Sequence, residues 1–423
     1  MRYRALAALC VFGGLALAAV QGRGAARSQT CDVTVRPGES VQAAVGRVGS
    51  GAVVCLEPGV YVGTVTLESR SDLTIQGAGR GRSILVPSPG RDVLLIFRSR
   101  GITVRDVSLV FGRPANAYVW RSVDVIFENV EFAGGEIGAH YDAGSVGRIA
   151  DSVAHSNRGD GILSRNNSTL TVERSWSVWN GGVGVSSVGE TANTTLAQNV
   201  IAFNEGPGVF AGVTPCALLP PGQLAAPACY FEDLQAYVGR GNLIMNANLV
   251  LGNQSTGLVL FPGTRVTMRG NNIWFNQLTG VFVWAAILQS EGDAFVGNEE
   301  HAVEVRAYPD PLSFGKAPAP FPWRPAGRIN NARITNQFRL DERILGGGVL
   351  SQGGNLSVTN SLIADNAGIG VSYVNGAIGS IEANRITGNG GSAICLHNAG
   401  AVTVSGNVTS GNLDDRPGVC RER

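Results

Sequence analysis

The sequence predicts an all-β protein that folds as a parallel β-helix, in which the chain coils and each coil stacks on the one before it. Three observations carry this prediction. Asn and Gly return together at intervals of about 23 residues. Short stretches in which apolar and polar residues alternate lie between them, as in β-strands. Gly accounts for 58 of the 423 residues, roughly twice its usual share.

The composition excludes several other classes of protein. Lys and Arg number 33 and Asp and Glu 32, so the formal net charge is +1, without the basic excess of a nucleic-acid-binding protein. Hydrophobic residues make up 44% of the chain, too many for a disordered protein. The Gly content argues against a helical bundle, and its lack of a three-residue period excludes collagen.

The first element in the chain is a predicted secretory signal peptide, residues 1–26. Arg2 and Arg4 precede an apolar stretch that runs to Val20, and small residues that suit cleavage follow, with alternatives at Ala18 and Ala26. We therefore expect a secreted or periplasmic protein. No later apolar run approaches the length of about 20 residues that a membrane span needs, so we expect no membrane attachment after cleavage.

The cysteines predict disulfides, because an exported chain with an even number of them usually pairs them. Six remain after the signal peptide, and six allow 15 connectivities. Free buried thiols are the alternative, and no Cys-x-x-Cys spacing indicates a metal site. The pairs nearest in sequence are Cys31–Cys55, Cys216–Cys229 and Cys395–Cys420.

An N-terminal cap is expected over residues 27–70, followed by the β-helix over 71–423. Residues 40–48 read as one short amphipathic helix, which would cover the open strand edges at the end of the coil stack. Ser-Val-Gln-Ala-Ala at 40–44 and Pro-Gly-Val-Tyr at 58–61 resemble the N-terminal cap of the pectate-lyase-like superfamily. That resemblance implies a right-handed, single-stranded parallel β-helix. It implies no single activity, because the superfamily holds lyases, hydrolases, epimerases and non-catalytic proteins.

The repeat defines the coils. A unit this short cannot bury its own apolar face and must stack on its neighbours. Asn at one corner of each coil can then hydrogen-bond along the stack, with coils about 4.8 Å apart. The marker Asn residues are 157, 180, 204, 253, 276, 298, 366, 389 and 412, and a second set five positions earlier is 199, 248, 271, 384 and 407.

Two insertions interrupt the repeat, at 213–240 and 307–328. Each begins just after the strand that follows a Gly four positions beyond the marker. We therefore expect both to leave the coil at the same edge of the same face. Long loops on a rigid scaffold often carry function.

Counting from the marker Asn, positions five and seven are small or apolar and should face inward, so positions six and eight should face outward. Two outward patches result. The first, with Gly134 in the marker place of its first coil, holds the predicted catalytic residues His140, Asp142 and Arg165, with Asp160 at the preceding corner. The second holds the predicted substrate-binding residues, Phe261, Phe282, Trp284, Glu304 and Arg306.

The first patch suits a uronic-acid lyase or epimerase. Such an enzyme needs a cation to offset the substrate carboxylate, a base for the C5 proton and an acid. Arg165 would offset the carboxylate, His140 would move the proton and Asp142 would orient one of them. The plain alternative is a surface ion pair between Asp142 and Arg165, worth at most about 1 kcal/mol. A glycoside hydrolase would need two carboxylates, either Asp142 with Asp160, or Glu304 with Asp310.

The second patch suits binding, since aromatic rings stack on the apolar faces of sugars. Ordinary sheet packing and a Glu304–Arg306 ion pair are the alternatives. His140-Tyr141-Asp142 resembles the Asp-Pro-His-Asp strand of alginate epimerases, without its first Asp and Pro. The Gly-His-Gly of polygalacturonases and the Trp-Ile-Asp-His of pectate lyases are absent.

Four histidines without paired spacing predict no zinc site, and calcium at exposed Asp clusters is the one cofactor left open. The expected function is a polysaccharide lyase or epimerase, favoured over a glycoside hydrolase, acting as a monomer on a glycan along the outer face of one sheet. The alternative is a non-catalytic secreted β-helix that binds glycans or serves as a cell-surface structural protein.

Overall fold

A computed structural model describes residues 30–189, 191–212, 241–262, 264–307, 325–338 and 346–421, together with two short strands at 214–215 and 229–230. Residues 32–423 form one compact unit. The predicted signal peptide and nearly all of both predicted insertions lie outside the described residues, as does Asp310. The insertions still have a defined origin, because β22 and β33, the strands that precede them, belong to the same sheet.

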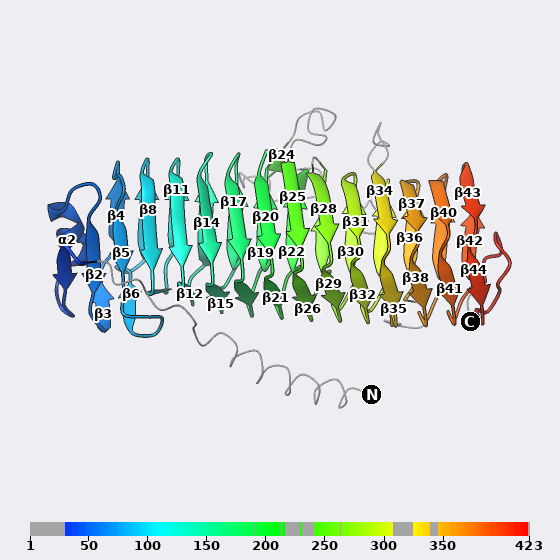
Figure 1. The fold of residues 1–423 in the computed structure, drawn as a ribbon, viewed down its shortest axis with the longest axis horizontal. Helices are drawn as coiled ribbons and strands as arrows, with labels where there is room; N and C mark the ends of the chain where they lie inside the picture. The colour runs from blue at the N-terminus through cyan, green and yellow to red at the C-terminus, as the bar shows by residue number, and fades with distance from the viewer. Residues whose placement is uncertain are drawn as a thin grey trace. The chain divides into compact units, whose positions relative to one another are not determined.

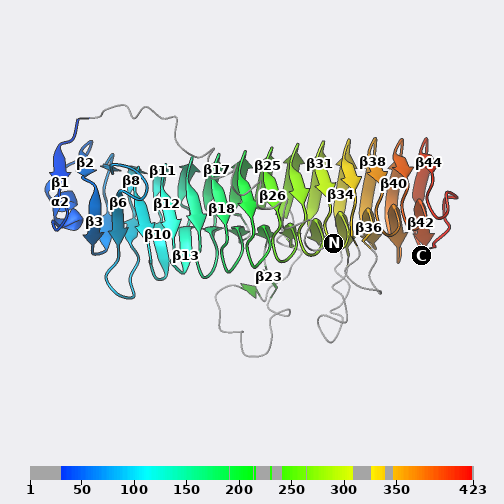
Figure 2. The same ribbon diagram turned by 90° about the horizontal axis from the view of Figure 1, so that it is seen from below.

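Three parallel sheets build the unit, and each coil contributes one strand to each sheet (Figures 1 and 2). Neighbouring strands within a sheet are mostly three elements apart in sequence, which is the mark of a single chain that returns to the same sheet once per coil. The fold is therefore the right-handed, single-stranded parallel β-helix that the sequence predicted.

The 15-stranded sheet begins each coil. Its strands are β1 (Val33–Val35), β2 (Val53–Leu56), β5 (Thr74–Gln76), β8 (Arg100–Arg105), β11 (Val123–Glu128), β14 (Val146–Ala150), β17 (Thr169–Glu173), β20 (Asn193–Ala197), β25 (Gly241–Asn246), β28 (Thr264–Arg269), β31 (Ile287–Glu291), β34 (Ala326–Asn330), β37 (Asn355–Thr359), β40 (Ile378–Glu382) and β43 (Val402–Ser405).

The 14-stranded sheet follows. Its strands are β3 (Gly59–Val62), β6 (Ser83–Val86), β9 (Ser108–Val110), β12 (Glu131–Ala133), β15 (Val153–His155), β18 (Trp176–Val178), β21 (Val200–Ala202), β26 (Leu249–Leu251), β29 (Asn272–Trp274), β32 (Ala294–Val296), β35 (Arg333–Thr335), β38 (Leu362–Ala364), β41 (Arg385–Thr387) and β44 (Val408–Ser410).

The 13-stranded sheet completes the coil. Its strands are β4 (Val65–Glu68), β7 (Leu94–Phe97), β10 (Ala115–Trp120), β13 (Ile137–Asp142), β16 (Ile162–Arg165), β19 (Val185–Val188), β22 (Val209–Gly212), β27 (Leu258–Leu260), β30 (Val281–Trp284), β33 (Val303–Arg306), β36 (Val349–Gln352), β39 (Val371–Val374) and β42 (Ile394–His397). Two further strands, β23 (Thr214–Pro215) and β24 (Cys229–Tyr230), pair with each other.

The marker Asn residues form the predicted ladder at the corner between the 14-stranded and 13-stranded sheets. The Nδ2 group of Asn204 donates to Oδ1 of Asn253 at 2.9 Å, and Asn253 donates in the same way to Asn276. Each backbone N–H also donates to the next Oδ1, as from Asn204 to Asn253 at 3.1 Å. Gln337 takes the marker place after Asn298 and accepts the same bond.

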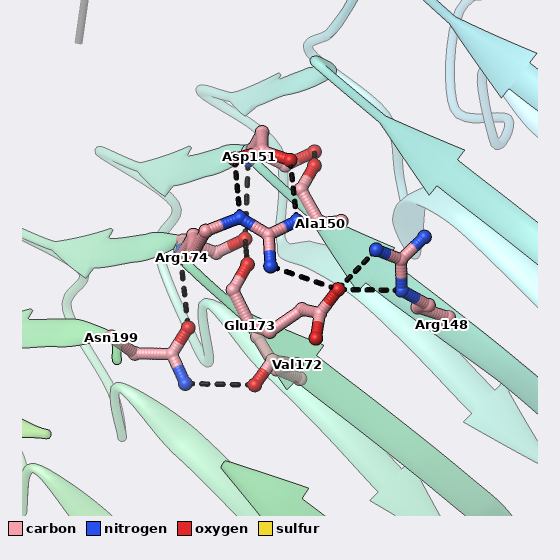
Figure 3. Close-up of polar contacts among 9 residues, drawn as sticks. Arg148, Ala150, Asp151, Val172, Glu173, Arg174 and Asn199 are labelled. Atoms are coloured by element: carbon pink, nitrogen blue, oxygen red, sulfur yellow. Dashed lines mark hydrogen bonds and ion pairs between the residues drawn. The ribbon is translucent and has the colours of Figure 1, made fainter. Parts of the chain in front are cut away.

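A second ladder occupies the corner between the 15-stranded and 14-stranded sheets. It begins with serines, and Asn199, Asn248 and Asn271 continue it. Beside its start, Figure 3 shows a network of charged side chains that ties two coils together. Arg174 donates to both carboxylate oxygens of Asp151, at 2.9 and 2.8 Å, and lies 3.1 Å from Glu173, which also accepts from Arg148.

The ends of the unit agree with the cysteine and helix predictions where they are described. Helix α2 (Val41–Arg47) begins at the N-cap Ser40, whose Oγ accepts from the Ala43 amide at 3.1 Å, and it packs on β1 and β4. Cys395 and Cys420 are bonded to each other, and Cys31 and Cys55 are each disulfide-bonded. The predicted Cys216–Cys229 pair lies outside the described side chains.

Asp293 occupies a place in the second ladder that Asn fills in the preceding coils. It is buried and accepts from Asn271 N and Nδ2 at 2.7 and 2.9 Å and from the Ser290 hydroxyl at 2.6 Å. Burial raises the pKa of its carboxyl above the ordinary value, although these hydrogen bonds oppose the shift. A raised folded-state pKa means that the contribution of this group to stability is lost as pH rises from about 4 through that pKa.

We therefore expect Asp293→Asn to stabilise the protein at pH 7 by about 1 kcal/mol and to have little effect at pH 4. The measurement is the free energy of unfolding in denaturant at both pH values. The mirror variant, Asn271→Asp, serves as the control and should destabilise at pH 7. Equal destabilisation by Asp293→Asn at both pH values would contradict the prediction.

Candidate functional site

A cluster of polar side chains lies on the outer side of the 13-stranded sheet, where β10, β13 and β16 run side by side. The register pairs Tyr118 with His140 and Trp120 with Asp142. The residues between them, such as Tyr141, are fully buried in the coil interior. Strand alternation therefore places His140 and Asp142 together on the outer side.

Asp142 is the hub of this cluster. Its Oδ2 accepts from the Tyr118 hydroxyl at 3.3 Å, and its Oδ1 accepts from Asn166 Nδ2 at 2.8 Å and from the Ala143 amide at 2.6 Å. His140 Nε2 lies 3.8 Å from Asp142 Oδ2, beyond hydrogen-bond distance. The rings of Tyr118 and His140 are 4.8 Å apart. Asp142 thus accepts a hydrogen bond from the Tyr118 phenol, whereas Nε2 of His140 makes no hydrogen bond with Asp142.

The surroundings keep both the imidazole and the phenol uncharged. The side chains of His140 and Asp142 are only 12% and 14% exposed. Burial, aided by the charge of Arg165 and opposed by Asp142, lowers the pKa of His140 to about 4. Burial and the charge of Asp142 raise the pKa of Tyr118 to about 12. At neutral pH the site therefore offers a neutral imidazole, a proton acceptor, next to a protonated phenol, a proton donor.

Arg165 stands at the end of β16, one place beyond the Tyr141–Ser164 register pair, and so beside Asp142 on the next coil. Its charge acts on both His140 and Tyr118. The structure thus brings together the three residues predicted as catalytic. Asp160 points elsewhere, because its carboxylate accepts from the Ser186 hydroxyl at 2.6 Å and the Val183 amide at 2.9 Å.

Aromatic rings and arginines continue the outer row toward the N-terminus. The rings of Phe97 and Trp120 stack with centroids 4.3 Å apart and planes 6° from parallel. The guanidinium of Arg121 lies 4.1 Å from the Trp120 ring centre, and that of Arg98 lies 4.9 Å from the Phe97 ring centre. Because Trp120 pairs with Asp142, these rings and arginines lie directly beside the cluster of Tyr118, His140 and Asp142.

Sequence reasoning missed Tyr118, Asn166 and the Phe97–Trp120 stack. The repeat in the sequence did place two of these residues, Tyr118 and Trp120, at outward positions. With Gly112 in the marker place, the register that found His140 and Asp142 gives Tyr118 at position six and Trp120 at position eight. Asn166 had no such signal, because it follows the strand in a left-handed turn conformation.

The second predicted patch is separated from the first along the same sheet by β19 and β22, and begins with Phe261, directly after β27. Its rings pack edge to face, with Phe261 centred 5.2 Å from Trp284, and Arg306 lies over Phe282 and hydrogen-bonds Glu304. The expectation of an exposed groove floor needs correction, because Trp284 and Glu304 are each only 2% exposed. Phe261 packs against Trp284, and Glu304 accepts hydrogen bonds from Arg306 and Thr279, contacts that counting positions along a strand cannot predict.

Within the described residues, no group of three or more His, Cys, Asp or Glu side chains is placed to hold a metal ion. In the same part of the chain, no helix has the length and apolar character needed to span a membrane.

Comparisons with known proteins concern the fold. The family model described as a right handed beta helix region matches residues 90–216 and 326–415. The A-module of mannuronan C-5 epimerase AlgE6 from Azotobacter vinelandii is similar with a TM-score of 0.59 at 19% identity, over 87% of this chain and 92% of that one. The AlgE4 A-module from the same organism gives 0.55 at 17% identity, over 89% and 93%.

The catalytic unit of a GH87 alpha-1,3-glucanase from Streptomyces thermodiastaticus gives a TM-score of 0.54 at 14% identity, over 95% of this chain and 72% of that one. No curated protein matches the sequence. At these identities the likeness to solved structures shows a shared fold.

The depressed pKa of His140 predicts how acid affects stability. The folded state holds the neutral imidazole, so its contribution is full above the unfolded-state pKa of about 6.5 and is lost as pH falls through about 4. We expect the free energy of unfolding to fall by up to about 3 kcal/mol across this interval because of this group. His140→Gln should flatten that part of the curve, measured by denaturant unfolding between pH 7 and pH 4. His397→Gln, at an exposed histidine, is the control and should leave the slope unchanged.

Proposed function

The chain belongs to the right-handed β-helix family, and from that premise we propose that it is an exported, carbohydrate-active protein, a lyase or epimerase of a uronic-acid polysaccharide. The observation that carries the proposal is the pairing of a neutral His140 and a protonated Tyr118 next to the cation Arg165. The disulfides are consistent with an extracytoplasmic location.

Arg165 would face the substrate carboxylate. A uronate C5 proton is weakly acidic, and its removal places negative charge on the adjoining carboxylate. A guanidinium held at that position stabilises the developing charge and lowers the barrier to proton removal. The guanidinium groups of Arg98 and Arg121 would bind the carboxylates of neighbouring uronate residues along the same row.

His140 would take the C5 proton on Nε2, which makes no hydrogen bond among the described residues, once the side chains that bury this atom have moved aside. In a lyase, the Tyr118 hydroxyl would give its proton to the glycosidic oxygen as the C4–O bond breaks, leaving a C4=C5 double bond. In an epimerase, Tyr118 would return a proton to the opposite face of C5. Asp142 positions Tyr118 in either case.

The epimerase modules reported above carry mannuronan C-5 epimerase in their titles, and their likeness to this chain supports the proposal only through the fold. The choice between elimination and epimerisation depends on which atom the Tyr118 proton reaches.

We expect His140→Ala and Tyr118→Phe each to lower turnover of a polyuronate by a factor of about 10²–10⁴, since each removes a general acid or base. Mannuronan and polygalacturonate are the substrates to use. Ultraviolet absorbance of the unsaturated product detects a lyase, and incorporation of deuterium at C5 from heavy water detects an epimerase.

Arg269→Ala, at an exposed residue of the 15-stranded sheet, is the matched control and should retain full activity. Unchanged turnover in both His140→Ala and Tyr118→Phe would remove the site assignment. Binding of polyuronate by the intact protein with neither unsaturation nor exchange would favour the non-catalytic alternative.

A further inference from the structure

A row of exposed aromatic side chains runs along the corner where each strand of the 14-stranded sheet ends. The residue after each strand, immediately before the ladder side chain, has a positive φ in every coil from β18 to β35. Successive coils place there Trp179, Phe203, Gly252, Phe275, Gly297 and Asn336, with φ between 53° and 67°.

Aromatic residues are unexpected at these positions for two reasons. Left-handed backbone is unfavourable for bulky side chains and suits Gly or Asn. Trp179 and Phe275 face water, 51% and 49% exposed, and Phe203 is half-buried. In other coils the same corner position holds Gly134, Ser156, Asp365, Gly388 and Gly411, and also Phe111, whose ring covers Gly134, so the fold accepts small or polar residues there as well as rings.

The rings and glycines fit one another. Trp179 and Phe203 stack with centroids 6.1 Å apart and planes 14° from parallel. The Phe203 ring covers Gly252, where a Cβ would lie 2.7 Å from a ring carbon. Phe275 covers Gly297 in the same way, with a ring carbon at 2.4 Å from such a Cβ. Glycine is therefore required at both positions, because a Cβ atom there would clash with the ring.

Phe338 completes the row. It follows Asn336 by two residues, is 49% exposed, and its ring approaches Gly297, 3.2 Å from the Cβ position. Phe203 and Phe275 are two coils apart, about 9.6 Å, whereas the Phe275 and Phe338 rings converge on Gly297. The row from the coil of Trp179 to the coil of Phe338 spans about 24 Å. The spacing of Phe203 and Phe275 is on the scale of a disaccharide unit in an extended glycan chain.

A polar row accompanies the rings two residues further along the chain, at Glu205, Gln254, Gln277 and Glu299. The backbone amide of each donates to the carbonyl of the ladder residue one coil earlier, as from Gln254 to Asn204 at 2.8 Å. The coil stack therefore holds this row parallel to the rings. Two carboxylates and two amides suit the hydroxyl groups of a sugar, and this row holds no cation to attract a polyanion.

We propose that Trp179, Phe203, Phe275 and Phe338 form a binding strip for a neutral, extended polysaccharide. The rings stack on the apolar faces of alternate sugars, and the polar row hydrogen-bonds their hydroxyls. The strip lies at the edge of the 14-stranded sheet, whereas the Tyr118–His140–Asp142 cluster lies on the 13-stranded sheet. It holds whether or not that cluster is catalytic, since the two sites share no residue.

The test uses glycine, which adopts positive φ without penalty. We expect Trp179→Gly and Phe275→Gly each to weaken binding of the full chain to insoluble cellulose or chitin by about tenfold, with no loss of melting temperature. Depletion of the protein from solution measures binding. Gln198→Gly is the control, because Gln198 is also exposed and at positive φ, but lies at the opposite corner, between β20 and β21.

Phe275→Asn provides a second variant compatible with left-handed backbone and should weaken binding equally. The proposal is overturned if the wild type binds neither polysaccharide, if it binds mannuronan but neither neutral polymer, if the strip variants bind as the wild type does, or if Gln198→Gly weakens binding as much. Tyr118→Phe should bind normally, which separates this site from the proposed catalytic one.

Discussion

The structure depends on one repeated interaction, the hydrogen bond from a corner side chain of one coil to the same side chain of the next. Asn serves best because a single amide accepts from the coil on one side and donates to backbone carbonyls, so each buried corner is satisfied without charge. Because each bond also fixes the height of a coil, residues some 23 positions apart come into register. Every functional surface in the molecule is built from that register.

This dependence explains what the sequence could predict. Regular Asn spacing predicts the ladders, and the ladders fix where each strand begins in its coil. Alternation along the strand then places His140 and Asp142 outward. Counting positions along the strands did not predict burial where neighbouring side chains cover an outward position. Trp284 and Glu304 occupy outward positions, yet neighbouring rings and Arg306 bury them. Tyr118 was missed because its coil carries Gly112 in the marker place and the count began one coil too late.

The same scaffold explains how charge is distributed in a chain with a net charge of +1. Ladder amides replace ionised groups inside, and Asp293 is an exception whose burial raises the pKa of its carboxyl. Outside, charges are paired between adjacent coils, as in the Arg148, Asp151, Glu173 and Arg174 network. Arg98 and Arg121, which lie over the Phe97 and Trp120 rings, add positive charge on one side of a single sheet, and the overall charge of the chain conceals it.

The two proposed glycan-binding surfaces place opposite demands on the coil. The proposed catalytic cluster on the 13-stranded sheet depends on burial, because burial lowers the pKa of His140 and raises that of Tyr118. The strip at the edge of the 14-stranded sheet needs exposure, because its rings must meet a sugar face directly. A parallel β-helix can meet both demands without compromise, since each coil sends different side chains to different faces at the same height. A single domain can therefore carry a catalytic site on one face and a polysaccharide-binding surface on another.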